Sequence, residues 1–252
     1  MQNELMNYRV FGNGHPVVFL HGFMESISMW QFIEEKEFPF QCILIDLPGH
    51  GNSELWDANE TPSLDFMAAE VQKVVQFLEI ENYHVVGHSM GGYVAMILKE
   101  SDDNCQKVVL LNSTFKEDSD LKKRDRVRVA DLALKAKNLF IQEAIPGLFY
   151  RFDKEEAVVR TLIEEAKHME GQAIAYAALA MRERTNTFHL FNDFPIDIFV
   201  VQGKHDPLIS CEIMQEDLVN HYNQLLVLED VGHMSHLESP KAAHQALRNL
   251  LA

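Results

Sequence analysis

The motif Gly-His-Ser-Met-Gly at residues 87–91 is the feature that most constrains how this chain can fold. The apolar run Tyr83–Val86 before it predicts a buried strand, and Tyr93–Leu98 after it has helical spacing. A strand that becomes a helix over so short a distance must turn sharply at Ser89. The flanking glycines have no Cβ atoms to collide across such a turn. The segment therefore predicts a strained strand–turn–helix with Ser89 at its tip.

A serine in this position can act as a nucleophile. An aliphatic hydroxyl attacks a carbonyl at neutral pH only when a base takes its proton. The amide of Met90 lies at the start of the predicted helix, where an N–H has no partner within the helix and can bind an anion. Because an ordinary Gly/Ser turn can have the same pentapeptide, the catalytic interpretation requires a histidine and a carboxylate further along the chain.

Partners of the required types follow two later strands. The apolar run Ile196–Val201 leads to Asp206, and Leu225–Leu228 leads to His233. The C-terminal ends of parallel strands meet at one edge of a sheet, where sites collect. The chain order Ser89, Asp206, His233 is the order expected when the nucleophile lies on a strand–helix turn. The sequence therefore predicts that these three side chains meet.

Other titratable side chains compete for these roles. Asp230 shares a loop with His233 and is poorly placed to reach its Nδ1 atom, so Asp206 is the preferred acid. Three further histidines are predicted to shape loops near the site, namely His50, His88 and His205. His236 lies close to His233, but no further cluster of ligands accompanies the pair, so we expect no metal site.

Strands and helices alternate over most of the chain. This alternation predicts right-handed crossovers and a mainly parallel sheet with helices on both faces. The runs Tyr8–Phe11 and Pro16–Leu20 are joined by Gly12-Asn13-Gly14, which has the chemistry of a hairpin turn. We therefore expect an opening hairpin that adds antiparallel strands at one edge of the sheet.

The alternation stops between Phe115 and about Asp193. The predicted helices of this stretch are Asp120–Asn138, Asn138–Ala144, Lys154–Glu170 and Gly171–Arg184. They predict a helical lid, residues 115–193, inserted into an α/β core made of residues 1–114 and 194–252. The charged run Lys122–Arg126 has mixed signs and is predicted to be a solvated helix face.

The charge of the chain restricts its partners. The 252 residues contain 22 Lys and Arg against 38 Asp and Glu, a formal net charge of −16. Nucleic acids and anionic membranes both require a basic surface, so neither is an expected partner. The sequence shows no signal peptide and no membrane span, and its cysteines are typical of reduced thiols. We therefore expect a cytoplasmic protein. Its expected partner is a small-molecule substrate. The oligomeric state is not predicted.

Five segments together resemble the α/β-hydrolase family, and the resemblance covers essentially the whole chain. They are His21-Gly22-Phe23, Asp46–Ser53, Gly87–Gly92, Gly203–Asp206 and Gly232-His233. The resemblance implies an α/β-hydrolase fold in which Ser89 is the nucleophile, His233 is the general base and then acid, and Asp206 orients the imidazole. It also implies an oxyanion hole made by the backbone N–H groups of Phe23 and Met90.

A serine at position 89 also restricts the chemistry, because dehalogenases and epoxide hydrolases of this fold have an aspartate nucleophile. The expected enzyme is a serine hydrolase, in particular a carboxylesterase, that forms an acyl-enzyme without a cofactor or metal. Its expected substrate is a small, mainly apolar and uncharged ester or thioester, since no cationic anchor is obvious. Apolar side chains of the insertion could line an acyl pocket or form the core of the lid, among them Phe140, Leu148, Phe149, Tyr150 and Met181.

Three other functions remain open. One is carbon–carbon chemistry on the same triad, as in the hydrolases of ring-cleavage products or a lyase of the menaquinone pathway. Menaquinone-type enzymes have an arginine shortly after the nucleophile, where this chain has Gly92-Tyr93. A cofactor-free perhydrolase is the second alternative. The third is a hydrolase-like receptor that binds a small molecule with little or no turnover.

Overall fold

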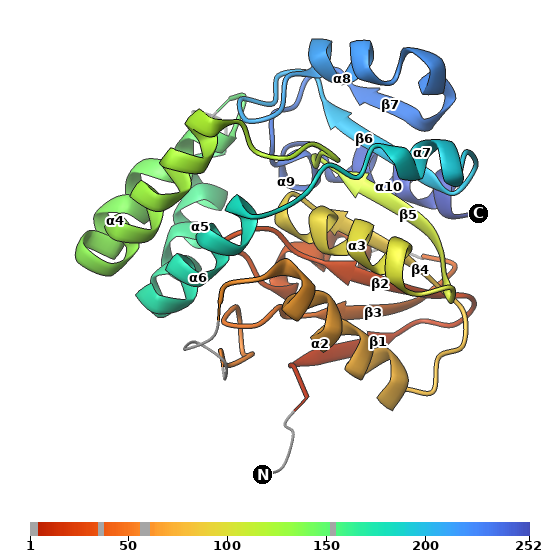
Figure 1. The fold of residues 1–252 in the computed structure, drawn as a ribbon, viewed down its shortest axis with the longest axis horizontal. Helices are drawn as coiled ribbons and strands as arrows, with labels where there is room; N and C mark the ends of the chain where they lie inside the picture. Colours follow the sequence, from red (N-terminus) through yellow and green to blue (C-terminus); the bar gives the residue numbers. More distant parts are fainter. Residues whose placement is uncertain (1–4, 35–37, 56–60, 152–154) are drawn as a thin grey trace.

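The computed structural model describes residues 5–34, 38–55, 61–151 and 155–252, and it contains a central sheet of seven strands (Figure 1). The strands are β1 (Tyr8–Phe11), β2 (Pro16–Leu20), β3 (Gln41–Ile45), β4 (Tyr83–His88), β5 (Cys105–Leu111), β6 (Ile198–Gly203) and β7 (Leu225–Leu228). Their order in the sheet is β1-β3-β2-β4-β5-β6-β7. Every neighbouring pair is parallel except β1 with β3. The predicted mainly parallel α/β sheet is therefore confirmed.

The predicted opening hairpin is wrong. Strand β1 pairs with β3, with Tyr8 opposite Ile45, and β2 lies between β3 and β4 as a parallel strand. The residues after Gln41 in β3 are completely buried, whereas the two middle residues of β1 are exposed, so β3 suits the interior of the sheet and β1 suits its edge. The glycine-rich connection passes close to the segment before β3, since a Cβ atom on Gly14 would lie 2.7 Å from the carbonyl oxygen of Pro39.

Helices cover both faces of the sheet. One face packs against α2 (Leu64–Phe77), α3 (Met90–Ser101), α7 (His189–Asp193) and α8 (Cys211–Asp217). The other face packs against η1 (Ile27–Trp30), which continues into α1 (Gln31–Glu34), and against α10 (Pro240–Leu251). Two short elements complete this part of the chain, η4 (Val219–Gln224) and α9 (Ser235–Glu238). Helix α2 begins after Ser63, whose hydroxyl accepts hydrogen bonds from the amides of Asp65 and Phe66.

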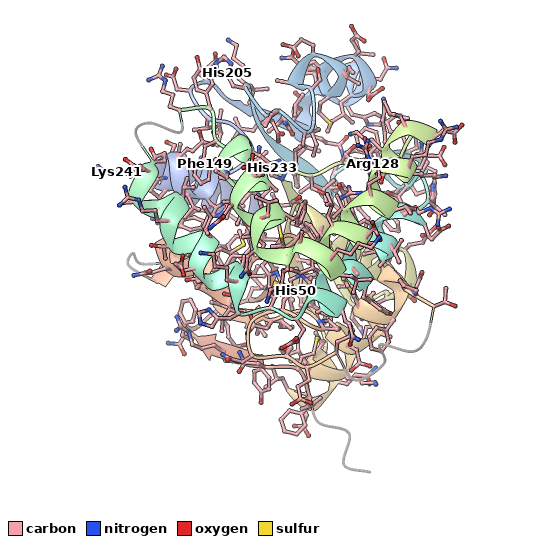
Figure 2. The ribbon with its side chains drawn as sticks, turned by 90° about the vertical axis from the view of Figure 1, so that its left-hand side faces the viewer. His50, Arg128, Phe149, His205, His233 and Lys241 are labelled. Atoms are coloured by element: carbon pink, nitrogen blue, oxygen red, sulfur yellow. The ribbon has the colours of Figure 1, made fainter. Side chains whose placement is uncertain are left out.

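The segment between β5 and α7 is helical in its described residues. It contains α4 (Asp120–Ala144), η2 (Pro146–Leu148), α5 (Glu156–Lys167) and α6 (Gly171–Arg182). The two helices predicted before Ala144 are one element, interrupted by the non-helical backbone of Ala136. Helices α4, α5 and α6 share an apolar core and form a layer beside the sheet, on the left of Figure 1. Viewed from that side, they lie in front of the sheet (Figure 2). No helix in the described parts of the chain is long and apolar enough to cross a membrane.

Candidate active site

Ser89 lies in the sharp turn between β4 and α3. Its backbone has φ +47° and ψ −113°, in the left-handed region that favours glycine. Such a conformation costs about 1–3 kcal/mol in a residue with a side chain. The turn packs closely against the end of β2, since a Cβ atom on Gly91 would lie 2.6 Å from the carbonyl oxygen of His21. The predicted strained strand–turn–helix is therefore present.

The three side chains predicted to meet form one hydrogen-bonded chain. His233 Nδ1 lies 2.8 Å from Asp206 Oδ2, and His233 Nε2 lies 2.9 Å from Ser89 Oγ. Because a carboxylate only accepts, Nδ1 carries the proton, and the Nε2 atom of a neutral imidazole accepts from the serine hydroxyl. Asp230 lies elsewhere, with a side chain that is 79% exposed and 3.5 Å from Arg151.

Asp206 is held as an anion by several donors. Its Oδ1 accepts from the amides of Leu208 and Ile209, at 2.9 and 3.0 Å. Its Oδ2 accepts from Asn112 Nδ2 at 3.0 Å and from Gln202 Nε2 at 3.2 Å, besides His233. Burial alone would raise the pKa of Asp206, but His233 and these hydrogen bonds lower it below its ordinary value. Asp206 is therefore ionised at neutral pH.

Asn112 is a positioning residue that the sequence analysis did not identify. It has φ +46° at the end of β5 and is completely buried. Its Nδ2 donates to Asp206 and also to the carbonyl oxygen of Gly232, at 3.0 Å each, and its Oδ1 accepts from Ser235 Oγ. Its position directly after a strand of the sheet is the sequence feature from which this role could have been predicted. Asn112 thus joins the loops that carry the acid and the base.

A buried ion pair lies next to these residues. His88 Nδ1 is 2.8 Å from Glu25 Oε2, and His88 Nε2 is 3.0 Å from the carbonyl oxygen of His233. Both partners only accept, so both ring nitrogens donate and His88 is an imidazolium. Burial opposes charge on both groups, yet their mutual attraction raises the pKa of His88 and lowers that of Glu25 to about 2. Glu25 also accepts from the amide of Gly22, at 2.5 Å. His88 was predicted to shape a loop near the site. Its ion pair with Glu25 was not predicted.

Other buried histidines near the site are neutral. Burial lowers the pKa of His50 and that of His236 to about 3 each, from 6.5. Between pH 6.5 and about pH 3, each of these histidines binds a proton in the unfolded chain but not in the folded protein. We therefore expect the free energy of unfolding to fall on acidification by about 1.4 kcal/mol per pH unit for each of them.

Urea unfolding between pH 7 and pH 4.5 measures this dependence, and His236→Phe provides the comparison. The ring of His236 already lies among aromatic rings, with centroids 6.3 Å from Trp30 and from Phe32. The variant should lose about 1.4 kcal/mol per pH unit of the dependence. An identical dependence in wild type and variant would contradict a neutral His236 in the folded protein.

A cavity of about 510 Å³ opens over Ser89 and His233. Its apolar wall includes Phe23, Phe140, Leu148, Met181 and Met234. Of the insertion side chains considered for a pocket, Phe149 is instead in the core shared by α4–α6. Tyr150 stacks on the ring of His205 at 3.7 Å. The cavity therefore joins the sheet edge to the α4–α6 layer.

Three cations also line this cavity, namely Lys122, Arg126 and Arg184. The interpretation of the run Lys122–Arg126 as a solvated helix face is therefore wrong for Arg126, whose side chain is 23% exposed. Lys122 is exposed as predicted, although it also lines the cavity. The sequence analysis found no obvious cationic anchor, whereas the structure places these cations at the cavity. Which face of α4 lines the cavity depends on how the helix packs against α6, and the charge pattern of α4 does not encode that.

Comparison with known proteins places this arrangement in a family. Residues 17–246 match the model described as "Alpha/beta hydrolase family". The chain belongs to the alpha/beta hydrolase family. The solved structure of a thermophilic esterase from Thermogutta terrifontis, with malate bound, is similar to this hydrolase with a TM-score of 0.88 and 27% identity, over 98% of this chain and 92% of the esterase.

Two relatives by sequence are also similar to this hydrolase. The (E)-2-((N-methylformamido)methylene)succinate hydrolase of Acinetobacter baylyi is 25% identical over 98% of this chain and 94% of the relative. The 2-succinyl-6-hydroxy-2,4-cyclohexadiene-1-carboxylate synthase of Serratia proteamaculans is 35% identical, but only over 32% of this chain and 30% of the relative.

Proposed function

We propose that this hydrolase cleaves a small carboxylic ester through an acyl-enzyme, with Ser89 as nucleophile. The observation that carries the proposal is the hydrogen-bonded chain from Ser89 through His233 to Asp206, at 2.9 and 2.8 Å, on the floor of a cavity. The similarity to an esterase and to a hydrolase over nearly the whole chain supports the same chemistry.

In the proposed mechanism, Ser89 Oγ attacks the ester carbonyl while His233 Nε2 takes its proton. Asp206 keeps the other imidazole proton on Nδ1 and stabilises the imidazolium that forms. His233 then protonates the leaving alcohol. A water molecule attacks the acyl group while His233 takes its proton, and His233 returns that proton to Ser89 Oγ as the acid leaves. His233 and Asp206 are buried, and the lower dielectric around them strengthens their electrostatic interaction.

The developing oxyanion would be bound by the amides of Phe23 and Met90. Met90 begins α3, where its N–H has no partner within the helix, and Phe23 lines the cavity. No hydrogen bond from either amide is found among the described residues. The contacts of Glu25 with Gly22 and His88 support the position of the Phe23 loop next to Ser89. Each donor of this kind contributes about 3–4 kcal/mol to the barrier reduction.

We also propose that α4–α6 act as a lid over the cavity. Side chains of α4 line the cavity together with Ser89, so a displacement of α4 would open it. The apolar lining then selects the acyl group by its length. Carbon–carbon chemistry on the same residues is the alternative, and the partial similarity to a synthase favours it over the other options.

Hydrolysis of a series of p-nitrophenyl esters tests this proposal. A cavity of about 510 Å³ should accept acetyl to hexanoyl groups. We therefore expect kcat/KM to be highest within that range and to fall for dodecanoate. Because each extra CH2 that finds no room forfeits about 0.8 kcal/mol, the decline should be several-fold per added group. Failure to hydrolyse any ester of the series, by protein whose Ser89 still reacts covalently, would favour the carbon–carbon alternative.

A further inference from the structure

The proposed mechanism uses Ser89 and His233 and leaves the cations that line the same cavity without a role. Lys122 and Arg126 project from α4, and Arg184 follows α6. These three cations lie together in a chain whose net charge is −16. Cations beside the proposed nucleophile of an acidic protein would attract an anionic ligand to that place.

A single buried carboxylate partly neutralises the cluster. Asp118, whose side chain is completely buried, lies 3.0 Å from Arg126 Nε through Oδ2 and 2.6 Å from Arg184 through Oδ1. Each guanidinium nitrogen of Arg184 has a partner, since Arg184 also donates to the carbonyl oxygens of Lys116 and Met181 and stacks over Tyr93 at 4.3 Å. Arg184 is thus a structural cation that holds Asp118 in place.

Arg126 differs from Arg184 in its unused donors. Asp118 engages only its Nε, and within the described parts of the chain its two terminal nitrogens have no acceptor. Its side chain is 23% exposed and lines the cavity. Lys122 donates to the carbonyl oxygen of Leu208 at 3.2 Å, which leaves other ammonium protons available. The pair therefore has donors and positive charge but no anion that matches them.

The other charges that line this cavity do not neutralise the pair. Asp125 lines the cavity too, but it lies 3.3 Å from Arg128, which is 79% exposed. Glu25 lines the cavity and forms its own pair with His88. Asp206, beside the cavity residue His233, is hydrogen-bonded to His233 and four other donors. Asp118 supplies one negative charge to the two arginines, so a ligand anion would be favoured at this wall.

We propose that the substrate carries a carboxylate group that binds to the terminal nitrogens of Arg126, with Lys122 as a second cation. A guanidinium with Nε occupied still presents a planar pair of donors that matches a carboxylate. This assignment rests on the proposed function, because the same cavity holds Ser89. It changes the expected substrate from an uncharged ester to one with an apolar part and one anionic end.

Equilibrium binding to the Ser89→Ala protein tests the anchor apart from the chemistry. The probes are p-acetoxybenzoate, with its carboxylate in the alcohol part, and monophenyl adipate, with its carboxylate in the acyl part. Each is compared with its neutral methyl ester. We expect at least one acid to bind about tenfold or more tighter than its methyl ester, the size of a hydrogen bond to a charged group. The pair that shows the preference identifies which part of the substrate meets Arg126.

Arg126→Gln, added to Ser89→Ala, should remove that preference and leave binding of the methyl ester within about twofold. Arg128→Gln is the matched control, since Arg128 lies on the same helix with an exposed side chain. Lys122→Met should weaken acid binding less, and added salt should weaken it further. Binding of the methyl ester also shows that each variant is folded.

The two possible failures are distinguishable. If neither acid binds tighter than its methyl ester, or if Arg126→Gln leaves the preference unchanged, the anchor is wrong whether or not wild type hydrolyses esters. If the preference is present and is lost in Arg126→Gln, but wild-type protein turns over no ester, the anchor stands and the proposed ester hydrolysis fails.

Discussion

Substitution of Ser89 by either alanine or glycine is expected to lower kcat for ester hydrolysis by about 10⁴–10⁶-fold. Both variants lack the hydroxyl that hydrogen-bonds to His233. They should differ in stability, because alanine keeps the strain of φ +47° and glycine relieves it. Strain of about 1–3 kcal/mol, less about 0.5–1 kcal/mol for glycine entropy, predicts that Ser89→Gly is more stable than Ser89→Ala by about 1 kcal/mol.

Urea unfolding of the two variants measures this difference. The matched control is Ser101, an exposed residue at the end of α3 whose φ is not positive. At that position glycine should be less stable than alanine, which is the usual order in helices. The same order at Ser89 would show that the turn is not strained. Activity near that of wild type in Ser89→Ala would remove Ser89 from the mechanism.

Asp206→Asn is expected to lower kcat by about 10⁴-fold with little change in KM. The amide that replaces the carboxylate can present an N–H to His233 Nδ1, which then must accept. The proton moves to Nε2, and the imidazole can no longer take a proton from Ser89. Steady-state kinetics of the purified variant at pH 7 measure the loss.

Asp230→Asn is the matched control for Asp206→Asn. It makes the same chemical change on the loop that carries His233, in a side chain that is 79% exposed. Its kcat should stay within about twofold of wild type, as expected of a surface substitution. A large loss in Asp230→Asn, with activity retained in Asp206→Asn, would reverse the assignment of the acid.

The proposed catalytic residues could be located from the sequence because each follows a strand of a parallel sheet. Ser89 lies between glycines that its turn requires, and Asp206 and His233 each follow an apolar run. Strand ends are local features, and parallel pairing brings them to one edge. The fold class was predictable for the same reason.

The features that were missed depend on contacts between distant segments. Strand β1 pairs with β3 rather than with β2, because the burial of β3 determines the order of the edge strands. Glu25 meets His88 across the core, and neither periodicity nor spacing indicates that pair. Arg126 lines the cavity because of the way α4 packs against α6. The pairing of β1, the Glu25–His88 contact and the position of Arg126 all depend on tertiary packing, which cannot be read from a single sequence.

Intact-mass spectrometry after reaction with a fluorophosphonate tests the central claim most directly. Wild-type protein should gain the mass of one adduct, peptide mapping should locate it on Ser89, and Ser89→Ala should gain none. A serine hydroxyl activated by a base forms such an adduct far faster at neutral pH than an ordinary serine does. An unlabelled wild-type protein, or an equal adduct on Ser89→Ala, would contradict a nucleophilic Ser89.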